Sequence, residues 1–351
     1  MMLTPDDLRA AVAKGIVTEA QSAQLIAFTE ARRMAQDTLT PVEEPFVLFK
    51  GFNEIFVVVG LVILFTGWCG VAMLFGLNMQ APAGATSVFL SLLTLVGIAF
   101  TARYFTLQRR MIAPSIALAI MTLLTSVVLG FALIGIGGAA EVAIVALIVT
   151  LVMSGFYAVF RVPFAAALIA GAVFSALWSG LTAVGVFGPA ASGFLVISEN
   201  GPLSVMTVLF GLAVFAVAMR MDMSDPMRVS TRSGTAFWLH IVAAPAIVNT
   251  VALNLLRSGG IAGQSTLVAF LLVIAVIAII IDRRSFLVSG AGYSVILAST
   301  VFSGGAAYAV LVLGLILVLL GAQWDRLRQR IMASLPDFPG KSNLPPYRMA
   351  A

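Results

Sequence analysis

The sequence predicts an all-α membrane protein, a polytopic bundle of about ten transmembrane helices with both termini in the cytoplasm. Three observations lead to this fold class. Hydrophobic residues make up 61% of the 351-residue chain and charged residues only 10%, far from the shares of a soluble domain. The apolar residues gather into long runs, and the basic residues fall between those runs, as they do in membrane proteins.

The apolar runs begin near residue 55, and each has about 18 to 25 residues, enough to cross a hydrocarbon core of roughly 30 Å. The predicted spans are residues 55–76, 84–105, 112–134, 139–160, 163–187, 202–220, 235–256, 264–282, 286–303 and 305–322. Proline stands near the start of three of them, at Pro114, Pro163 and Pro202. A missing N–H costs least at such a position.

The distribution of basic residues predicts the orientation. When alternate connections between spans are grouped, all 20 Lys and Arg residues except Arg257 fall on one side. Cytoplasmic loops carry an excess of Lys and Arg. We therefore expect both termini in the cytoplasm and an even number of spans.

Three regions are expected. Residues 1–47 predict a cytoplasmic helical hairpin and a linker, because Gly15 is placed to end a first helix and Thr18 with Gln21 matches a capping box that opens a second. Residues 48–322 form the transmembrane domain. Residues 323–351 form a basic, proline-containing cytoplasmic tail, in which Trp324 is expected at the membrane interface and the last residues are expected to be extended or disordered.

Small residues predict a close helix contact in the fifth span. Ala167, Gly171, Ser175, Ser179 and Ala183 recur at intervals of four, which places them in one ridge of a helix. Such a ridge lets another membrane helix approach closely. We interpret it as a packing feature and not as a substrate site.

The best candidate site lies on the seventh span, within residues 233–257. This apolar stretch carries the only histidine of the chain. Its candidate residues for substrate binding or a transport pathway are Trp238, His240, Pro245, Asn249 and Asn254. Polar groups in a membrane helix are costly and face protein or water, so we expect this helix inside the bundle. Pro245 is expected to kink it and to free backbone carbonyls.

Each of these residues also has a structural interpretation. His240 is a candidate proton carrier or substrate ligand, since its ordinary pKa is near 6.5. The alternative is a histidine that hydrogen-bonds to a neighbouring helix near the interface. Asn249 either lines a polar cavity or ties two helices together.

Acidic residues near the predicted membrane are few. Glu54 opens the first span, Glu141 opens the fourth, Glu199 lies in an external loop and Asp282 ends the eighth beside Arg283. An ion-coupled transporter often has a carboxylate within the membrane. None of these is placed at the bilayer centre, which argues against proton or sodium coupling.

The residue inventory excludes several classes of function. One histidine and one cysteine do not provide a multi-histidine or four-cysteine metal site, so we expect no metal, cofactor or catalytic residues. The sequence Gly340-Lys341-Ser342 lacks the first glycine of a phosphate-binding loop, since Leu335 stands there. Basic residues form no single patch, so nucleic acid is not an expected partner.

Two stretches resemble an uncharacterised, domain-of-unknown-function family of bacterial inner-membrane proteins. They are LRAAVAKGIVTEAQSAQLIAF in the predicted hairpin and AFWLHIVAAPAIV at residues 236–248; the tail, with Trp324 and Leu344-Pro345-Pro346, is similar as well. The resemblance implies a multi-pass protein of the bacterial inner membrane and brings no known activity. It also implies that histidine is common at the position of Asn249, which argues against a paired-histidine role here.

Two functions stay open. One is a small-solute transporter or permease, with ten spans dividing into two inverted halves of five, although the two halves show no convincing sequence repeat. The other is a non-catalytic scaffold or regulatory subunit whose N-terminal hairpin docks a protein partner. For a third function, an enzyme that acts on lipid, the sequence offers few candidate catalytic residues. Besides the bilayer, the expected partners are a small-molecule substrate for the first function and a protein for the second.

Overall fold

The computed structural model describes residues 11–24, 51–78, 83–187, 201–258, 260–287, 291 and 306–346. The chain divides into two compact units, residues 1–43 and 44–351. Within the described residues the secondary structure is helical, and no strand occurs among them.

In the N-terminal unit, two predicted helix signals are confirmed. Gly15 adopts a φ of 69°, which a glycine reaches without steric cost, and its N–H donates to the carbonyl of Val12 at 2.9 Å. The N–H of Thr18 donates to Oε1 of Gln21 at 3.0 Å, and the N–H of Gln21 donates to Oγ1 of Thr18 at 3.2 Å. The rest of the predicted hairpin and its linker lie outside the described residues.

Eight helices in the described part of the chain are long and apolar enough to cross a membrane, and they match the first eight predicted spans. They are α3 (Phe52–Asn78), α4 (Ala83–Ala102), α5 (Ile112–Ile134), α6 (Ala139–Phe160), α7 (Pro163–Ala183), α8 (Gly201–Met223), α9 (Thr231–Ser258) and α10 (Gly260–Ile281). A π-helical segment, η1 (Arg103–Gln108), continues α4. The chain is therefore a multi-pass integral membrane protein.

The last two predicted spans are not among these eight helices. Most of residues 286–303 lies outside the described residues. Residues 305–322 coincide with α12 (Ala306–Ala322), an apolar helix of 17 residues. At about 1.5 Å per residue it is roughly 26 Å long, slightly less than the hydrocarbon core. Ten spans and cytoplasmic termini thus stay predictions.

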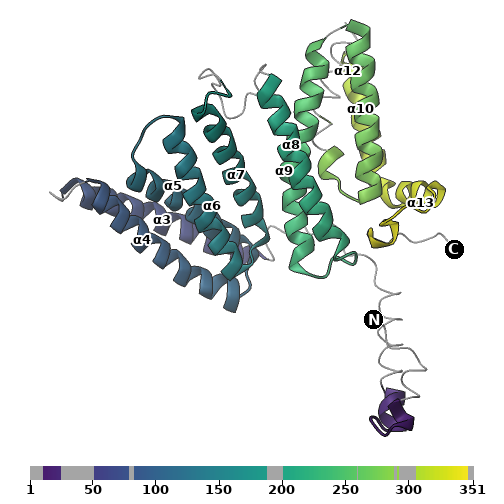
Figure 1. Cartoon of the computed structure of the whole chain (residues 1–351), viewed down its shortest axis with the longest axis horizontal. Coiled ribbons are helices and arrows are strands. Elements are labelled where there is room, and N and C mark those ends of the chain that lie inside the picture. The colour runs from purple at the N-terminus through teal and green to yellow at the C-terminus, as the bar shows by residue number, and fades with distance from the viewer. Residues whose placement is uncertain are drawn as a thin grey trace. The chain divides into compact units, whose positions relative to one another are not determined.

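Consecutive helices pack as neighbours, and α7 also contacts α9; Figure 1 shows α8 beside α9 and the short α13 near α10. More than half of the span of α9, 56%, is buried, the largest share among the eight. The expectation that this helix lies inside the bundle is confirmed. Its buried face meets α7 and α8 in a seam that includes Ala166, Ala170, Ala218 and Ala243. The buried alanines of α7 are Ala166 and Ala170. Each comes one position before a residue of the predicted ridge, Ala167 or Gly171.

The C-terminal tail begins with a helix, which the sequence analysis did not predict. The helix α13 (Trp324–Ser334) is followed by coil and a 3₁₀ turn, η2 (Lys341–Asn343). Trp324 is only 2% exposed and packs into the core of α9 and α10. The tail is therefore part of the packed structure up to residue 346.

Glu54 connects α3 to α5 by capping a helix 58 residues away. Its carboxylate accepts hydrogen bonds from the backbone N–H groups of Ile112, at 3.2 and 3.3 Å, and Ala113, at 3.0 Å. These groups belong to the first turn of α5, where backbone donors lack partners within the helix and the dipole favours an anion. The carboxylate is buried, so the contact orients α3 on α5.

We expect Glu54→Gln to destabilise the protein by about 1.5–3 kcal/mol, the usual contribution of a hydrogen bond to a charged group. Unfolding of the purified protein in detergent measures this change. Glu141→Gln is the matched control, because Glu141 lies in the first turn of its own helix, α6. An equal loss in the two variants would contradict the capping role of Glu54.

Candidate functional site: a buried charge network at the ends of α8, α9 and α10

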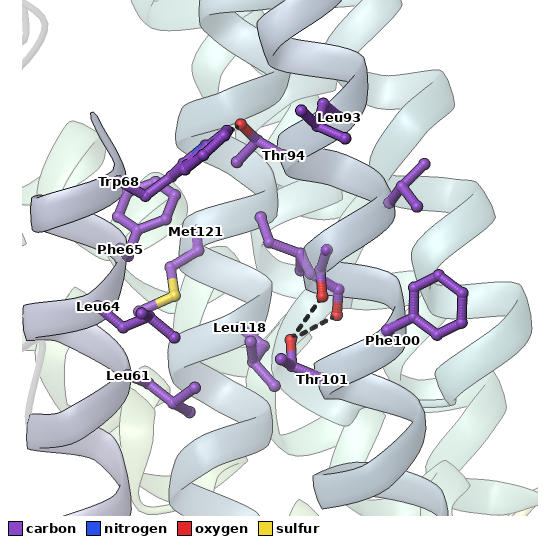
Figure 2. A pocket seen from close by; sticks show the side chains of 13 residues that line it. Leu61, Leu64, Phe65, Trp68, Leu93, Thr94, Phe100, Thr101, Leu118 and Met121 are labelled. Atoms are coloured by element: carbon purple, nitrogen blue, oxygen red, sulfur yellow. Dashed lines mark hydrogen bonds between the residues drawn. The ribbon is translucent and has the colours of Figure 1, made fainter. Parts of the chain in front are cut away.

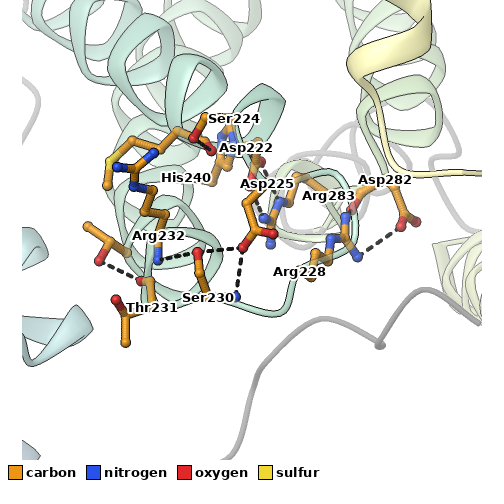
Figure 3. Close-up of polar contacts among 12 residues, drawn as sticks. Asp222, Ser224, Asp225, Arg228, Ser230, Thr231, Arg232, His240, Asp282 and Arg283 are labelled. Atoms are coloured by element: carbon orange, nitrogen blue, oxygen red, sulfur yellow. Dashed lines mark hydrogen bonds and ion pairs between the residues drawn. The ribbon is translucent and has the colours of Figure 1, made fainter. Parts of the chain in front are cut away.

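The site is centred on Asp222, near the C-terminal end of α8. This helix runs three residues beyond the span predicted to end at residue 220, and the extension carries the carboxylate into contact with α9 and the segment after α10. Asp222 is 5% exposed. Arg283 follows the last turn of α10, and His240 lies in the third turn of α9, so three elements converge on one carboxylate (Figure 3).

Arg283 binds Asp222 through two parallel hydrogen bonds. Its Nε donates to Oδ2 at 2.9 Å, and its Nη2 donates to Oδ1. Paired contacts of this kind fix the guanidinium plane as well as neutralise the charge. The arginine is fully buried, and a buried charge of this kind is costly unless it is paired.

His240, on α9, contacts the same carboxylate of Asp222. Its Nε2 lies 3.0 Å from Oδ2 of Asp222, and the residue is fully buried. Two aromatic rings approach it edge-on, Phe215 at 5.5 Å and Phe286 at 6.0 Å between ring centroids. The imidazole is therefore enclosed by apolar surface on its sides and held at one nitrogen by a carboxylate.

Two buried nitrogen atoms of this group have no hydrogen-bond partner among the described residues. They are Nδ1 of His240 and Nη1 of Arg283. Most buried polar atoms in folded proteins are paired, and an exception calls for an explanation such as strain or a functional role. The network thus retains hydrogen-bonding capacity that its own side chains do not use.

A second carboxylate, Asp282, lies beside this group. Nη1 of Arg228 is 2.9 Å from Oδ2 of Asp282, and Nη2 of Arg228 donates to its backbone carbonyl at 2.8 Å. Both residues adopt left-handed backbone conformations, with φ of 55° and 57°. A side chain in this region costs about 1–2 kcal/mol, and strain of this kind clusters at functional sites.

The charge state of Asp282 follows from its neighbours. Burial alone would raise the pKa of this carboxyl, but Arg228, Arg328 and the hydrogen bond from Trp324 more than offset burial. The pKa of Asp282 consequently lies below its ordinary value of 3.8. Asp282 follows the last residue of α10 and is charged at neutral pH.

Helix α13 and the tail cover the network through Asp282. Nε1 of Trp324 donates to Oδ1 of Asp282 at 2.7 Å. Nη2 of Arg328 donates to the carbonyl of Pro345 at 2.6 Å, and its Nη1 to that of Pro346 at 3.3 Å. The buried arginine thus ties Pro345 and Pro346 to α13, and α13 is tied to the end of α10 through Asp282.

The loop between α8 and α9 is organised by Asp225. Its carboxylate accepts from the backbone N–H of Ser230 at 2.8 Å and from the Ser230 hydroxyl at 2.6 Å. The hydroxyl oxygen of Ser230 in turn accepts from the N–H of Arg232, in the first turn of α9. This capping fixes where α9 begins. It therefore also fixes the side of α9 on which His240 lies relative to α8.

Of the five predicted site residues, only His240 belongs to the network. Trp238 is half-buried and packs edge-on against Phe164 of α7, with centroids 4.7 Å apart. Pro245 lies inside α9, which continues as a helix on both sides of it. Asn249 is half-buried and Asn254 exposed; they stand about 13 and 21 Å further along the helix axis.

The network contains residues that the sequence analysis missed as site residues. They are Asp222, Arg228, Arg283, Trp324 and Arg328, and Asp282 was noted only as a span end. Asp222 escaped notice because the sixth span was predicted to end at residue 220. The available signal was the position of oppositely charged residues at the ends of the sixth and eighth spans, which the predicted topology places on one side.

No group of three or more His, Cys, Asp or Glu side chains that could hold a metal ion occurs within the described residues. Comparison with protein-family models, with curated proteins and with solved structures finds no match for this chain. The chemistry of the network therefore has to be inferred from its own geometry.

The arrangement is suited to proton exchange coupled to helix movement. Asp222 is shared by one permanent cation, Arg283, and one side chain that can lose its charge, His240. A proton placed on the carboxylate weakens both contacts at once, because a neutral acid attracts a guanidinium less strongly than a carboxylate does. Each partner belongs to a different element, so a change of protonation changes how those elements are held together.

We expect single substitutions in the buried pair to be far more harmful than a joint one. Asp222→Leu or Arg283→Met leaves an uncompensated buried charge and should cost about 3–5 kcal/mol. The double variant should recover most of that loss, since an apolar pair of similar volume is often as stable as a buried ion pair. Unfolding in detergent provides the comparison, with Asp337→Leu, Lys341→Met and their double at a more exposed pair as controls.

We expect Asp282→Asn to loosen α13. Loss of the charge leaves Arg228 and Arg328 without their shared carboxylate, so limited proteolysis should cut the tail several-fold faster. In the wild type, the pKa of Asp282 is lower in the folded protein than in the unfolded chain. As the pH falls, the unfolded chain therefore binds the proton first. Docking is therefore fully supported above pH 3.8 and lost as the pH falls through the lower folded value. Asp325→Asn, an exposed position on the same helix, should leave cleavage unchanged; equal cleavage of both variants would contradict the role of Asp282.

Proposed function

We propose that this protein is a proton-linked transporter of small solutes, and that Asp222, His240 and Arg283 form its proton-binding site. The observation that carries the proposal is the buried carboxylate of Asp222, held between a permanent cation and an imidazole in a membrane helix bundle. Ionisable residues in such a position often mark ion pathways and proton relays. The sequence argued against proton coupling because no such carboxylate was identified in it, and the buried Asp222 supports the opposite inference.

A purely structural role explains this group less well. A buried ion pair is weak evidence for stability, because an apolar pair of similar volume is often at least as stable. A structural polar network should also be fully hydrogen-bonded, whereas Nδ1 of His240 and Nη1 of Arg283 have no partner among the described residues. Unused donors and acceptors suit a site that exchanges partners during its function.

The charged groups around His240 come from three elements. Asp222 faces it from α8, Arg283 from the segment after α10, and Arg228 from the loop between α8 and α9. A proton arriving on Asp222 or His240 changes the balance between these attractions and repulsions. The proposed coupling step is a rearrangement of α8 and α10 around α9.

The distribution of basic residues supports placing this network on the cytoplasmic side. In that orientation the site opens or closes toward the cytoplasm, and α13 with the tail covers it from the same side. The resemblance noted for the two sequence stretches supports the bacterial inner membrane as the location.

The second candidate function, a scaffold or regulatory subunit, is favoured by one observation. Trp324, Arg328 and the carbonyls of Pro345 and Pro346 fasten the C-terminal tail onto the network. A docked tail of this kind suits a protein whose tail is released to a partner. The predicted docking of a partner on the N-terminal hairpin belongs to this alternative.

The test uses the full chain in liposomes with a trapped pH-sensitive dye and an imposed pH gradient. Amino acids, sugars, nucleosides and polyamines are added in turn as probe solutes. At least one class should dissipate the gradient faster than in empty liposomes. The neutral pair Asp222→Asn/Arg283→Gln keeps hydrogen-bonding groups but removes the carboxylate of the proposed proton site, so it should lose this effect while its folded yield stays at the wild-type level.

The control neutralises a pair outside the network by Asp337→Asn/Lys341→Gln, in which the carboxylate is exposed, and it should transport as the wild type does. Proton movement that survives unchanged in the Asp222→Asn/Arg283→Gln protein would overturn the assignment of the site. If no solute class moves protons, but removal of residues 324–351 exposes a surface that binds a protein partner, the scaffold function replaces the transporter.

A further inference from the structure

A cavity of about 490 Å³ lies between α3, α4 and α5, far along the chain from the charge network. Figure 2 shows its lining, which includes Leu61, Phe65, Trp68, Leu93, Phe100 and Met121. A neighbouring cavity of about 320 Å³ shares Phe65, Trp68 and Thr94 with it. The two cavities therefore adjoin around the same three side chains.

The cavity is open to the surroundings of the helices. Several of its lining residues are largely exposed, including Phe100 at 71% and Leu64 at 64%. In a membrane, lipid acyl chains contact side chains that are exposed in this way. The contact between α3 and α4 is slight, and both helices rest on α5, which leaves the space between them accessible.

The polar groups in the lining are already satisfied. Nε1 of Trp68 donates to Oγ1 of Thr94 at 2.7 Å, and that hydroxyl donates to the carbonyl of Leu90 at 2.7 Å. The hydroxyl of Thr101 lies 2.9 Å from the carbonyl of Ile98 and 3.1 Å from that of Gly97. Apolar cavities without available polar groups stay dry and accept apolar ligands. An acyl chain fits this chemistry, and a polar solute does not.

A positive charge follows the part of α4 that lines the cavity. Val96 and Phe100 line the cavity, and Arg103 continues their helix stripe at a spacing of four and then three residues. The side chain of Arg103 is exposed. The adjacent Tyr104 accepts a hydrogen bond from Nε of Arg109 at 3.0 Å, and aromatic and basic residues are typical of the membrane interface. The phosphate of a lipid would meet Arg103 there.

We propose that this cavity is a binding site for one anionic phospholipid, with an acyl chain between α3 and α4 and its phosphate at Arg103. Charge complementarity favours an anionic lipid, since basic groups beside membrane helices attract the acidic lipids of the cytoplasmic leaflet.

The experiment is native mass spectrometry of the full chain after detergent extraction and incubation with phosphatidylglycerol or phosphatidylcholine. The wild type should retain one phosphatidylglycerol in preference to phosphatidylcholine. Gly97→Phe fills the cavity, because a Cβ built at Gly97 has no atom within 4 Å and the residue lines the cavity. It should lower lipid retention by roughly tenfold or more, as expected when two or more methylene groups lose their burial.

Arg103→Gln should abolish the preference for the anionic lipid and leave retention of phosphatidylcholine unchanged. Gly155→Phe, at an exposed glycine of α6 with open space around it, and Arg220→Gln, at an exposed arginine of α8, are the matched controls and should behave as the wild type. If Gly97→Phe does not yield folded protein, Val96→Trp obstructs the cavity from an exposed position.

A second readout uses lipid with brominated acyl chains, which quench indole fluorescence on contact. The part of the quenching that Trp68→Phe removes should also be lost in Gly97→Phe. Undiminished lipid retention in the cavity-filling variants would overturn the proposal. So would a chain dimer that carries no lipid in the wild type and dissociates in Gly97→Phe, since it would identify a second copy as the occupant.

Discussion

The pairing of Asp222 with Arg283 is the interaction that fixes how three elements in the second half of the structure meet. A charged side chain at the centre of a membrane helix costs about 2.5–3.5 kcal/mol on insertion scales, and a buried charge near a helix end also needs a partner. Because one is carried by α8 and the other follows α10, the pair holds these elements together around α9. The position of His240 against Oδ2 of Asp222 then sets the rotation of α9.

The same requirement explains the unusual backbone around the network. Left-handed backbone most often falls on a glycine, yet Arg228 and Asp282 occupy that region beside the network, as Arg110 and Arg161 do elsewhere in the chain. A glycine would remove the strain but also the charge. At Arg228 and Asp282 the charges pair with each other across the gap between α8 and α10. Ion pairing there maintains a conformation that neither residue adopts readily alone.

Long apolar runs and local capping signals could be predicted from the sequence because they depend on neighbouring residues. The first eight membrane helices and the Thr18–Gln21 capping box are examples. Contacts between distant residues could not be predicted in this way. Glu54 caps a helix 58 positions away, and Asp222 lies beyond a predicted span end that was wrong by three residues. His240 was identified because it is the only histidine, whereas its partners are common residue types.

The cavity between α3 and α4 and the charge network differ in whether the protein satisfies the hydrogen bonds of their polar side chains. In the cavity, Trp68, Thr94 and Thr101 use their polar groups within the protein, so the surface that remains is apolar and suits a lipid chain. In the network, His240 and Arg283 keep buried nitrogen atoms without a partner among the described residues. Hydrocarbon offers such atoms no hydrogen-bond partner. They are the polar surface on which the proposed transport function rests.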